Sequence, residues 1–288
     1  MESNKLAQTL KALHVPSQPL ILANVWDIAS LNMVLSLNTK SSKPVKAIAT
    51  ASWAFAASLG IRDEELTMEQ NLATIRSLAP TVARAGLPLS VDLQDGYGPR
   101  IREAVTAAVQ AGAHGANLED SIPSQGFGKG VEGSLYPIDR QVHRLHLARQ
   151  AAAAAGCPDF VINARCDIFA LDDVPGLDHN ARVHEAIKRG KAYLEAGATT
   201  IFFWCGYGTG FAEDQVRELV KELDGRVAIR LGQTKGALSA AELGKLGVAR
   251  VSVGPSLFQI AMHAAKQSAI DILQGGQLQE VYKPDEQD

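Results

Sequence analysis

Short apolar segments alternate with longer helical segments along almost the whole chain, and this alternation constrains the fold more than any other feature. The apolar segments are rich in β-branched residues, which is typical of strands buried on both faces of a parallel sheet. We predict eight such strands, at Leu20–Asn24, Ala47–Ser52, Leu89–Asp92, Gly115–Leu118, Phe160–Ala164, Thr200–Trp204, Val227–Leu231 and Arg250–Val253. The intervening segments predict helices, including Met68–Ala85, Arg100–Ala111, Asp139–Ala155, Asn180–Ala196, Glu213–Leu223 and Ala240–Leu246.

The order of these elements predicts an α/β fold of the (β/α)8 TIM barrel type. Three helices run into a glycine directly before the next strand, at Gly112, Gly197 and Gly247, which is a common junction in such folds. A doubly wound open sheet is the alternative, but no GxGxxG motif follows the first strand. Since the chain contains no linker or low-complexity segment, we expect residues 1–288 to form a single domain with a short polar tail at 277–288.

Composition and charge exclude several classes of function. The net charge is only −3 and Lys and Arg form no basic stripe, so we expect no nucleic-acid partner. No apolar run reaches the roughly 18 residues needed to span a bilayer, and no apolar segment follows Met1–Lys5, so we expect neither a membrane span nor a secretory signal. The three cysteines predict neither a disulfide framework nor a CxxC metal site, which favours a reducing, cytoplasmic location. They are Cys157, Cys166 and Cys205.

Several of the predicted strands end in acids, or in an arginine. Because the carboxyl ends of barrel strands carry the chemistry, these side chains should meet at one mouth, where a charge must be paired or bound to a metal. We predict that Asp92 and Glu119 hold Mg2+ or Mn2+, partly through water. Arg165 offers a planar fork for a substrate carboxylate, and residues 50–52 can cradle a second carboxylate or a phosphate.

These assignments have simpler alternatives. An acid at a strand end is often a helix cap or an ion-pair partner, and Arg165 could simply neutralise Glu119 or Asp167. The joint pattern nevertheless favours a bound 2-oxo acid, because a metal beside an anion-binding pocket can stabilise an enolate as a Lewis acid.

Several motifs in order together resemble the isocitrate lyase and phosphoenolpyruvate mutase superfamily over roughly residues 20–265. They are Thr50-Ala51-Ser52, Ser58-Leu59-Gly60 with Asp63, Val91-Asp92 with Gly96-Tyr97-Gly98, Gly115 to Glu119-Asp120, Asn163-Ala164-Arg165-Cys166-Asp167 and Arg250-Val251-Ser252-Val253-Gly254-Pro255. The resemblance implies a Mg2+-dependent barrel that makes or breaks C–C or P–C bonds next to a 2-oxo acid. It also implies a homo-oligomer, often a tetramer, in which the last helix swaps between subunits. That helix is Ser256–Leu273, although an ordinary last barrel helix is the simpler interpretation.

The resemblance also suggests roles for individual residues. The metal site would be formed by Asp92 and Glu119, with Gln94 at a third position. The catalytic candidates are Arg165, Asp63, Lys129 and Tyr136. The substrate-binding candidates are Trp26, Asp27, Thr50, Ala51, Ser52, Gly96, Tyr97, Arg165 and Trp204.

The chain departs from the superfamily pattern at the metal, the lid and the far wall. Gln94 stands where a second acid is usual, and neighbouring Asp95 would need a backbone adjustment to replace it. The segment at residues 121–130 lacks the Cys and His of the lyase lid. The glycines at residues 126–133 still suggest a mobile lid, with Ser124, Lys129 and Tyr136 as candidate acids or bases, and an unstructured solvent loop is the alternative. An acidic residue after the sixth strand is replaced by Trp204, and an Asn after the seventh by Ala228.

Three hypotheses therefore remain open. The leading one is a Mg2+-dependent lyase that cleaves a 2-hydroxy or 2-oxo acid through a metal-stabilised enolate. The second is an oxaloacetate-type C–C hydrolase or a P–C bond mutase. The third is a degenerate member that binds a 2-oxo acid without turnover.

Overall fold

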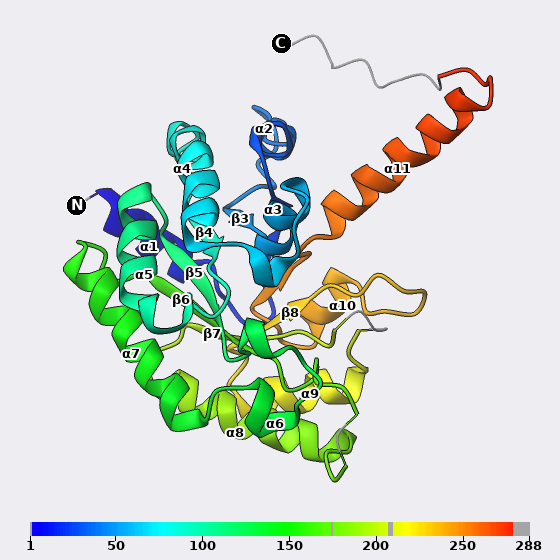
Figure 1. Ribbon diagram of the computed structural model, residues 1–288. Coiled ribbons are helices and arrows are strands. Elements are labelled where there is room, and N and C mark those ends of the chain that lie inside the picture. The colour runs from blue at the N-terminus through cyan, green and yellow to red at the C-terminus, as the bar shows by residue number, and fades with distance from the viewer. Residues whose placement is uncertain (1, 174, 207–209, 279–288) are drawn as a thin grey trace.

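Nine parallel strands wind into an almost closed ring in the computed structural model, which describes residues 2–173, 175–206 and 210–278 (Figure 1). The strand order is β1-β9-β8-β7-β6-β5-β4-β3-β2, and only Ala23 separates β1 from β2. The predicted first strand is thus two short strands, one pairing with β9 and the other with β3. The strands are β1 Leu20–Leu22, β2 Asn24–Val25, β3 Ile48–Thr50, β4 Leu89–Asp92, β5 Gly115–Glu119, β6 Val161–Cys166, β7 Thr200–Phe203, β8 Val227–Arg230 and β9 Arg250–Ser252.

Helices follow the strands in alternation, which confirms the predicted (β/α)8 barrel. The α-helices are α1 Glu2–Ala12, α2 Ile28–Ser36, α3 Ser52–Ser58, α4 Met68–Arg84, α5 Ile101–Ala111, α6 Gly130–Ser134, α7 Ile138–Ala154, α8 His179–Glu195, α9 Glu213–Glu222, α10 Ala240–Lys245 and α11 Ser256–Leu273. Three 3-10 helices are η1 Asp63–Glu65, η2 Gly98–Arg100 and η3 Pro123–Gln125. The second predicted strand was too long, because Ser52 already begins α3.

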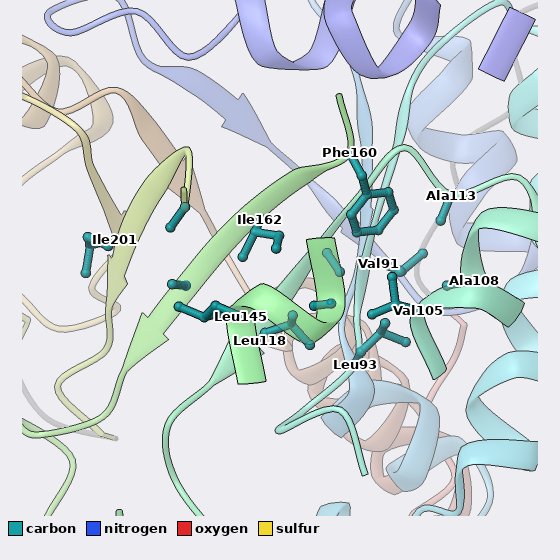
Figure 2. Packing of buried hydrophobic residues seen from close by; sticks show 14 of the residues in the cluster. Val91, Leu93, Val105, Ala108, Ala113, Leu118, Leu145, Phe160, Ile162 and Ile201 are labelled. Atoms are coloured by element: carbon teal, nitrogen blue, oxygen red, sulfur yellow. The ribbon is translucent and has the colours of Figure 1, made fainter. Parts of the chain in front are cut away.

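The core lies between the sheet and the surrounding helices (Figure 2). Successive side chains of a strand point to opposite faces, so Val91 and Leu118 pack outward in this core while their neighbours Asp92 and Glu119 point into the barrel. A second cluster joins Leu10 of α1 to apolar residues of β1, β3 and β6. The same alternation therefore builds the core and sends polar side chains into the barrel.

Helix α11 extends away from the barrel body (Figure 1). Of its residues only Ser256 is buried, and the helix exposes Ile260, Met262, Ile272 and Leu273. None of the described helices is both long and apolar enough to cross a membrane. Most of the polar tail expected at 277–288 falls in residues 279–288, outside the described part of the chain.

Burial of His114 predicts a loss of stability in mild acid. Its side chain is 5% exposed, and its Nδ1 accepts a hydrogen bond of 3.0 Å from the backbone N–H of Leu89. Burial lowers the pKa of His114 from 6.5 to about 4. Between these two values the unfolded chain binds the extra proton, so the free energy of unfolding falls as the pH drops through this window.

We expect His114→Asn to shrink this loss, because the Asn amide oxygen can accept the same hydrogen bond without titrating. The measurement is the Tm of both proteins at intervals from about pH 7 to about pH 4. An equally steep decline of Tm in the variant would show that His114 does not contribute to the acid sensitivity.

Candidate active site

The carboxyl ends of the barrel strands open into one cavity of about 310 Å3. Eight of the strands, β2 to β9, contribute residues at or near their carboxyl ends, and so do the segments that follow β3 and β5. The lining residues are Asn24, Ala51, Ser52, Trp53, Asp63, Glu64, Asp92, Gln94, Asn117, Glu119, Ser121, Ile122, Pro123, Gly126, Phe127, Arg165, Phe202, Trp204, Arg230, Ser252, Gly254 and Pro255.

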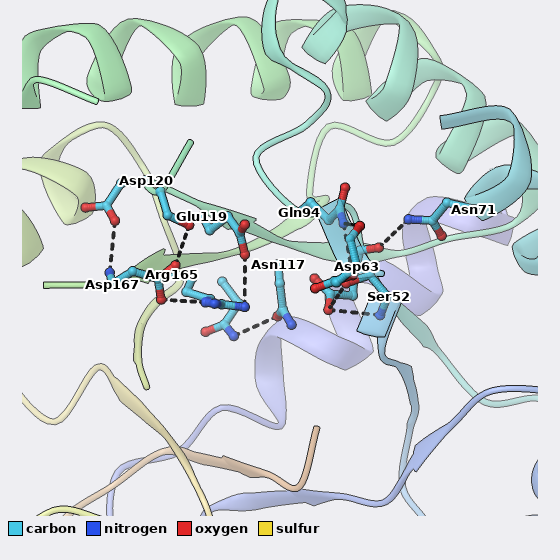
Figure 3. Close-up of polar contacts among 12 residues, drawn as sticks. Ser52, Asp63, Asn71, Gln94, Asn117, Glu119, Asp120, Arg165 and Asp167 are labelled. Carbon is cyan, nitrogen blue, oxygen red and sulfur yellow. Dashed lines mark hydrogen bonds and ion pairs between the residues drawn. The ribbon is translucent and has the colours of Figure 1, made fainter. Parts of the chain in front are cut away.

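One side of the cavity, where Figure 3 labels Ser52, Asp63 and Gln94, is built around the carboxylate of Asp92. Its Oδ2 accepts hydrogen bonds of 3.1 Å from both the backbone N–H and the hydroxyl of Ser52. Its backbone N–H donates to Thr50 Oγ1 at 2.9 Å. Residues 50–52 thus hold the Asp92 carboxylate in place.

Asp63 lies beside Asp92, and the amide nitrogen of Gln94 donates to its Oδ1 at 2.9 Å. Burial, and after it the negative charge of Asp92, raise the pKa of Asp63 to about 6. Two acids in one buried site repel each other, so this side of the cavity favours a bound cation.

Glu119 and Arg165 form the other side. Arg165 Nη1 lies 2.9 Å from Glu119 Oε2, and its Nε donates to Asp167 Oδ1 at 2.6 Å. The guanidinium also lies over the ring of Trp204, 4.6 Å from the centroid. Burial raises the pKa of Glu119; Arg165 opposes this, and the charges of Asp167, Asp92 and Asp63 add to the rise.

The donor set fits a hard divalent cation held mainly by two carboxylates. In the described contacts Asp92 and Glu119 engage Oδ2 and Oε2, which leaves the second oxygen of each as a ligand. Gln94 uses its nitrogen for Asp63 and so retains an amide oxygen. The described residues contain no group of three His, Cys, Asp or Glu side chains arranged around a metal. This set matches Mg2+ or Mn2+, which keep several waters.

Asp95 points away from the cavity. Of the two neighbours Gln94 and Asp95, only Gln94 lines it. The Asp95 carboxylate accepts from the backbone of Tyr97 and Gly98 at 2.8 and 3.1 Å, and Arg144 lies 3.5 Å from it. Gln94 itself has a positive φ of 51°. This backbone turn separates the two neighbouring side chains.

Two of the predicted catalytic residues lie off the cavity lining. The hydroxyl of Tyr136 donates to Asp95 Oδ2 at 2.7 Å, and its ring lies under Arg144. Burial and the charge of Asp95 raise the pKa of Tyr136 to about 12. Lys129 is exposed and donates to Gln125 at 2.5 Å.

Five predicted substrate-binding residues also lie off the lining. Asp27 caps α2 by accepting from the backbone of Ser30 at 2.7 Å. Trp26 packs edge-on against Phe258, and the Tyr97 hydroxyl accepts from Asn71 at 2.6 Å. The other two are Thr50 and Gly96, whereas Ala51, Ser52 and Trp204 do line the cavity.

Several other lining residues were not predicted from the sequence. Arg230 ends β8 and could have been noticed as a lone charge closing an apolar strand. Asn117 lies inside β5, and its position two residues before Glu119 places it on the same strand face. The wall is made more apolar by Trp53, Phe127 and Phe202. A single aromatic residue has no sequence pattern that would identify it as part of a site.

The phosphoenolpyruvate phosphomutase family matches residues 10–273, almost the whole chain. The chain belongs to the phosphoenolpyruvate mutase/isocitrate lyase superfamily. The superfamily resemblance inferred from the strand-end motifs is thereby confirmed.

The relatives that this chain resembles carry different protein names. The chain is 28% identical to an uncharacterized protein of Mycobacterium tuberculosis (strain ATCC 25618 / H37Rv), over 92% of this chain and 89% of that protein. It is 34% identical to the 2-methylisocitrate lyase of Escherichia coli K12, over only 51% of this chain and 46% of the lyase. A crystal structure assigned as a phosphonomutase, from Burkholderia cenocepacia J2315, superposes with a TM-score of 0.78. It is 32% identical, over 95% of this chain and 100% of that chain.

Proposed function

We propose that this protein is a Mg2+- or Mn2+-dependent lyase that makes or breaks a C–C bond next to a 2-oxo or 2-hydroxy carboxylic acid. The observation that carries this proposal is the meeting of Asp92, Glu119 and Arg165 at one cavity. The first two offer oxygen ligands to a hard cation. Arg165 retains N–H donors beyond those that it gives to Glu119 and Asp167, and these can bind a carboxylate. Superfamily relatives named as lyases support the same class of reaction.

The chemistry divides among a few residues. When bound, the divalent ion would supply Lewis-acid stabilisation of the charge that develops on the oxo acid. Arg165 would hold the substrate carboxylate, with its own position fixed by Asp167 and Trp204. Asp63, whose pKa is raised by burial and by the charge of Asp92 before an ion binds, would take up and return the substrate hydroxyl proton.

Apolar residues on the cavity wall restrict the class of substrate that can bind. Phe127 and Trp204 stack edge to face, with ring centroids 5.6 Å apart, and Ile122 and Phe202 also line the cavity. Such a surface favours an alkyl substituent over a further carboxylate, because a carboxylate left unpaired against apolar side chains loses its hydration. We therefore propose a mono- or dicarboxylate with an apolar branch.

P–C bond chemistry is the second candidate. A specific observation favours it: the chain is 28% identical to the phosphonopyruvate hydrolase of Variovorax sp. (strain Pal2), over 75% of this chain and 71% of that enzyme. A phosphonate is an oxyanion, like a carboxylate, and would bind the same guanidinium of Arg165.

The test combines binding with turnover. Calorimetry with oxalate, a planar mimic of the oxo-acid enolate, should show binding in the presence of Mg2+ or Mn2+ and little without either. Oxaloacetate, 2-methylisocitrate, phosphonopyruvate and phosphoenolpyruvate should then be assayed for C–C or P–C cleavage. Metal-dependent oxalate binding without turnover of any of them would favour a binding protein, and the absence of metal-dependent oxalate binding would contradict the proposal.

We also propose that the protein is a homo-oligomer, a tetramer or a dimer, in which α11 docks on a neighbouring subunit. The exposed apolar residues of this helix, such as Met262 and Leu273, would then be covered. Sedimentation velocity should show a species larger than the 30.7 kDa chain. We expect Met262→Glu combined with Leu273→Glu to shift it toward the monomer, whereas a wild-type monomer would contradict the proposal.

A further inference from the structure

The side-chain amide of Asn117 lines the cavity and is held in place by two buried neighbours. Asn117 is 7% exposed and lines the cavity between the Glu119–Arg165 pair and the Ser52 side (Figure 3). Its Oδ1 accepts two hydrogen bonds, from Asn163 Nδ2 at 2.8 Å and from Arg250 Nη2 at 3.1 Å. Neither partner lines the cavity, and both are almost fully buried.

These partners determine which end of the amide faces the cavity. A guanidinium can only donate hydrogen bonds, so the Asn117 atom facing Arg250 must be the oxygen. Burial lowers the pKa of Arg250 to about 10, which leaves it protonated at neutral pH. A flipped amide would place its NH2 group against this buried cation and remove one of its acceptors.

Asn163 has the matching orientation. Because Asn117 presents its oxygen, Asn163 must present its NH2 group to it, and Asn163 Oδ1 then accepts from the Thr200 hydroxyl at 2.6 Å. Among the described residues, the hydrogen bonds of the Asn117 side chain all involve Oδ1. Its Nδ2 is therefore the polar atom that remains for a molecule bound in the cavity.

We propose that Asn117 is a substrate-binding residue whose Nδ2 donates a hydrogen bond to an anionic oxygen of the bound oxo acid. Arg250, Asn163 and Thr200 are positioning residues that act through it. The inference rests on the proposed function, because it needs a carboxylate or enolate oxygen in this cavity. A pre-oriented donor is effective there, since it costs no reorganisation when negative charge develops.

The first test is oxalate affinity in Asn117→Asp, measured by calorimetry at saturating Mg2+. This variant keeps an oxygen toward Arg250 but replaces the donor by an acceptor. We expect oxalate to bind about ten- to a hundredfold more weakly, as for the loss of a hydrogen bond to a charged group. The matched control is Asn38→Asp, where the amide bonds the backbone of Val45 outside the cavity, and its oxalate affinity should not change.

The second test separates positioning from simple support of the fold. Thr200→Val should weaken oxalate binding several-fold in the wild-type background and have no further effect in the Asn117→Asp background. Thr200→Ser, which keeps the hydroxyl, should bind oxalate with the wild-type affinity. Equal losses from Thr200→Val in both backgrounds would show that Thr200 does not act through Asn117.

The outcomes distinguish the two proposals. If the wild-type protein binds oxalate with metal and Asn117→Asp binds it equally well, the role of Asn117 is wrong and the proposed function stands. If the wild-type protein binds no oxalate with either Mg2+ or Mn2+, the proposed function is wrong and the role of Asn117 falls with it.

Discussion

Asp92→Asn and Glu119→Gln should each weaken metal-dependent oxalate binding by roughly a hundredfold or more. Each change removes a charged oxygen ligand while keeping the shape of the side chain. Even the residues that only support a metal ligand typically contribute about 10- to 100-fold to metal affinity, so loss of a direct ligand should cost at least as much. The measurements are calorimetric titrations with Mg2+ alone and then with oxalate at fixed Mg2+.

The control is Asp139→Asn, which removes one negative charge from an exposed position on α7. It changes the net charge by the same amount and should leave both titrations unchanged. Wild-type affinity for Mg2+ in both Asp92→Asn and Glu119→Gln would mean that no metal is held at this cavity. Loss in only one of them would identify the carboxylate that carries the ion.

Arg189→Met should destabilise the fold by about 3–5 kcal/mol, because it leaves a buried acid without its partner. Arg189 is 2% exposed, and its Nη1 lies 3.0 Å from Asp120 Oδ2. The same carboxylate accepts from the Tyr193 hydroxyl at 2.8 Å, while its Oδ1 accepts from the backbone of Asp167 at 2.9 Å. This network ties the segments just after β5 and β6 to α8, next to the lining residues Glu119 and Arg165.

Urea unfolding of Arg189→Met and wild type measures this difference. The control is Arg217→Met, which breaks an exposed ion pair with Glu213 on α9. An exposed pair is worth about 0–1 kcal/mol, so this variant should unfold near the wild-type midpoint. Equal, small shifts in both variants would show that the Asp120–Arg189 pair adds little to stability.

Much of the fold could be predicted from local patterns. The eight apolar segments and the helices between them follow from periodicity, which depends on residues close together in the chain. The boundary errors arise where contacts with distant residues decide the end of an element. Ser52, for example, leaves the strand because its N–H and hydroxyl bind the carboxylate of Asp92, a residue far along the chain.

The candidate site was predictable only in part. Asp92, Glu119 and Arg165 come together because parallel strands deliver their carboxyl ends to one face, a rule that needs no coordinates. Tyr136 was placed in the lid on chain position alone. In the structure Asp95 binds its hydroxyl and Arg144 covers its ring, so it lies off the cavity lining.

The sequence by itself determined the barrel and the set of acids at its mouth, because strand order and side-chain alternation are local and periodic. Only the tertiary structure decided which way individual polar groups turn. Gln94 lines the cavity while Asp95 turns away to Arg144, and the amide of Asn117 is oriented by Arg250, 133 residues away in the chain. The physical reason is that a buried polar atom takes the partner that folding brings to it, and those partners come from distant parts of the chain.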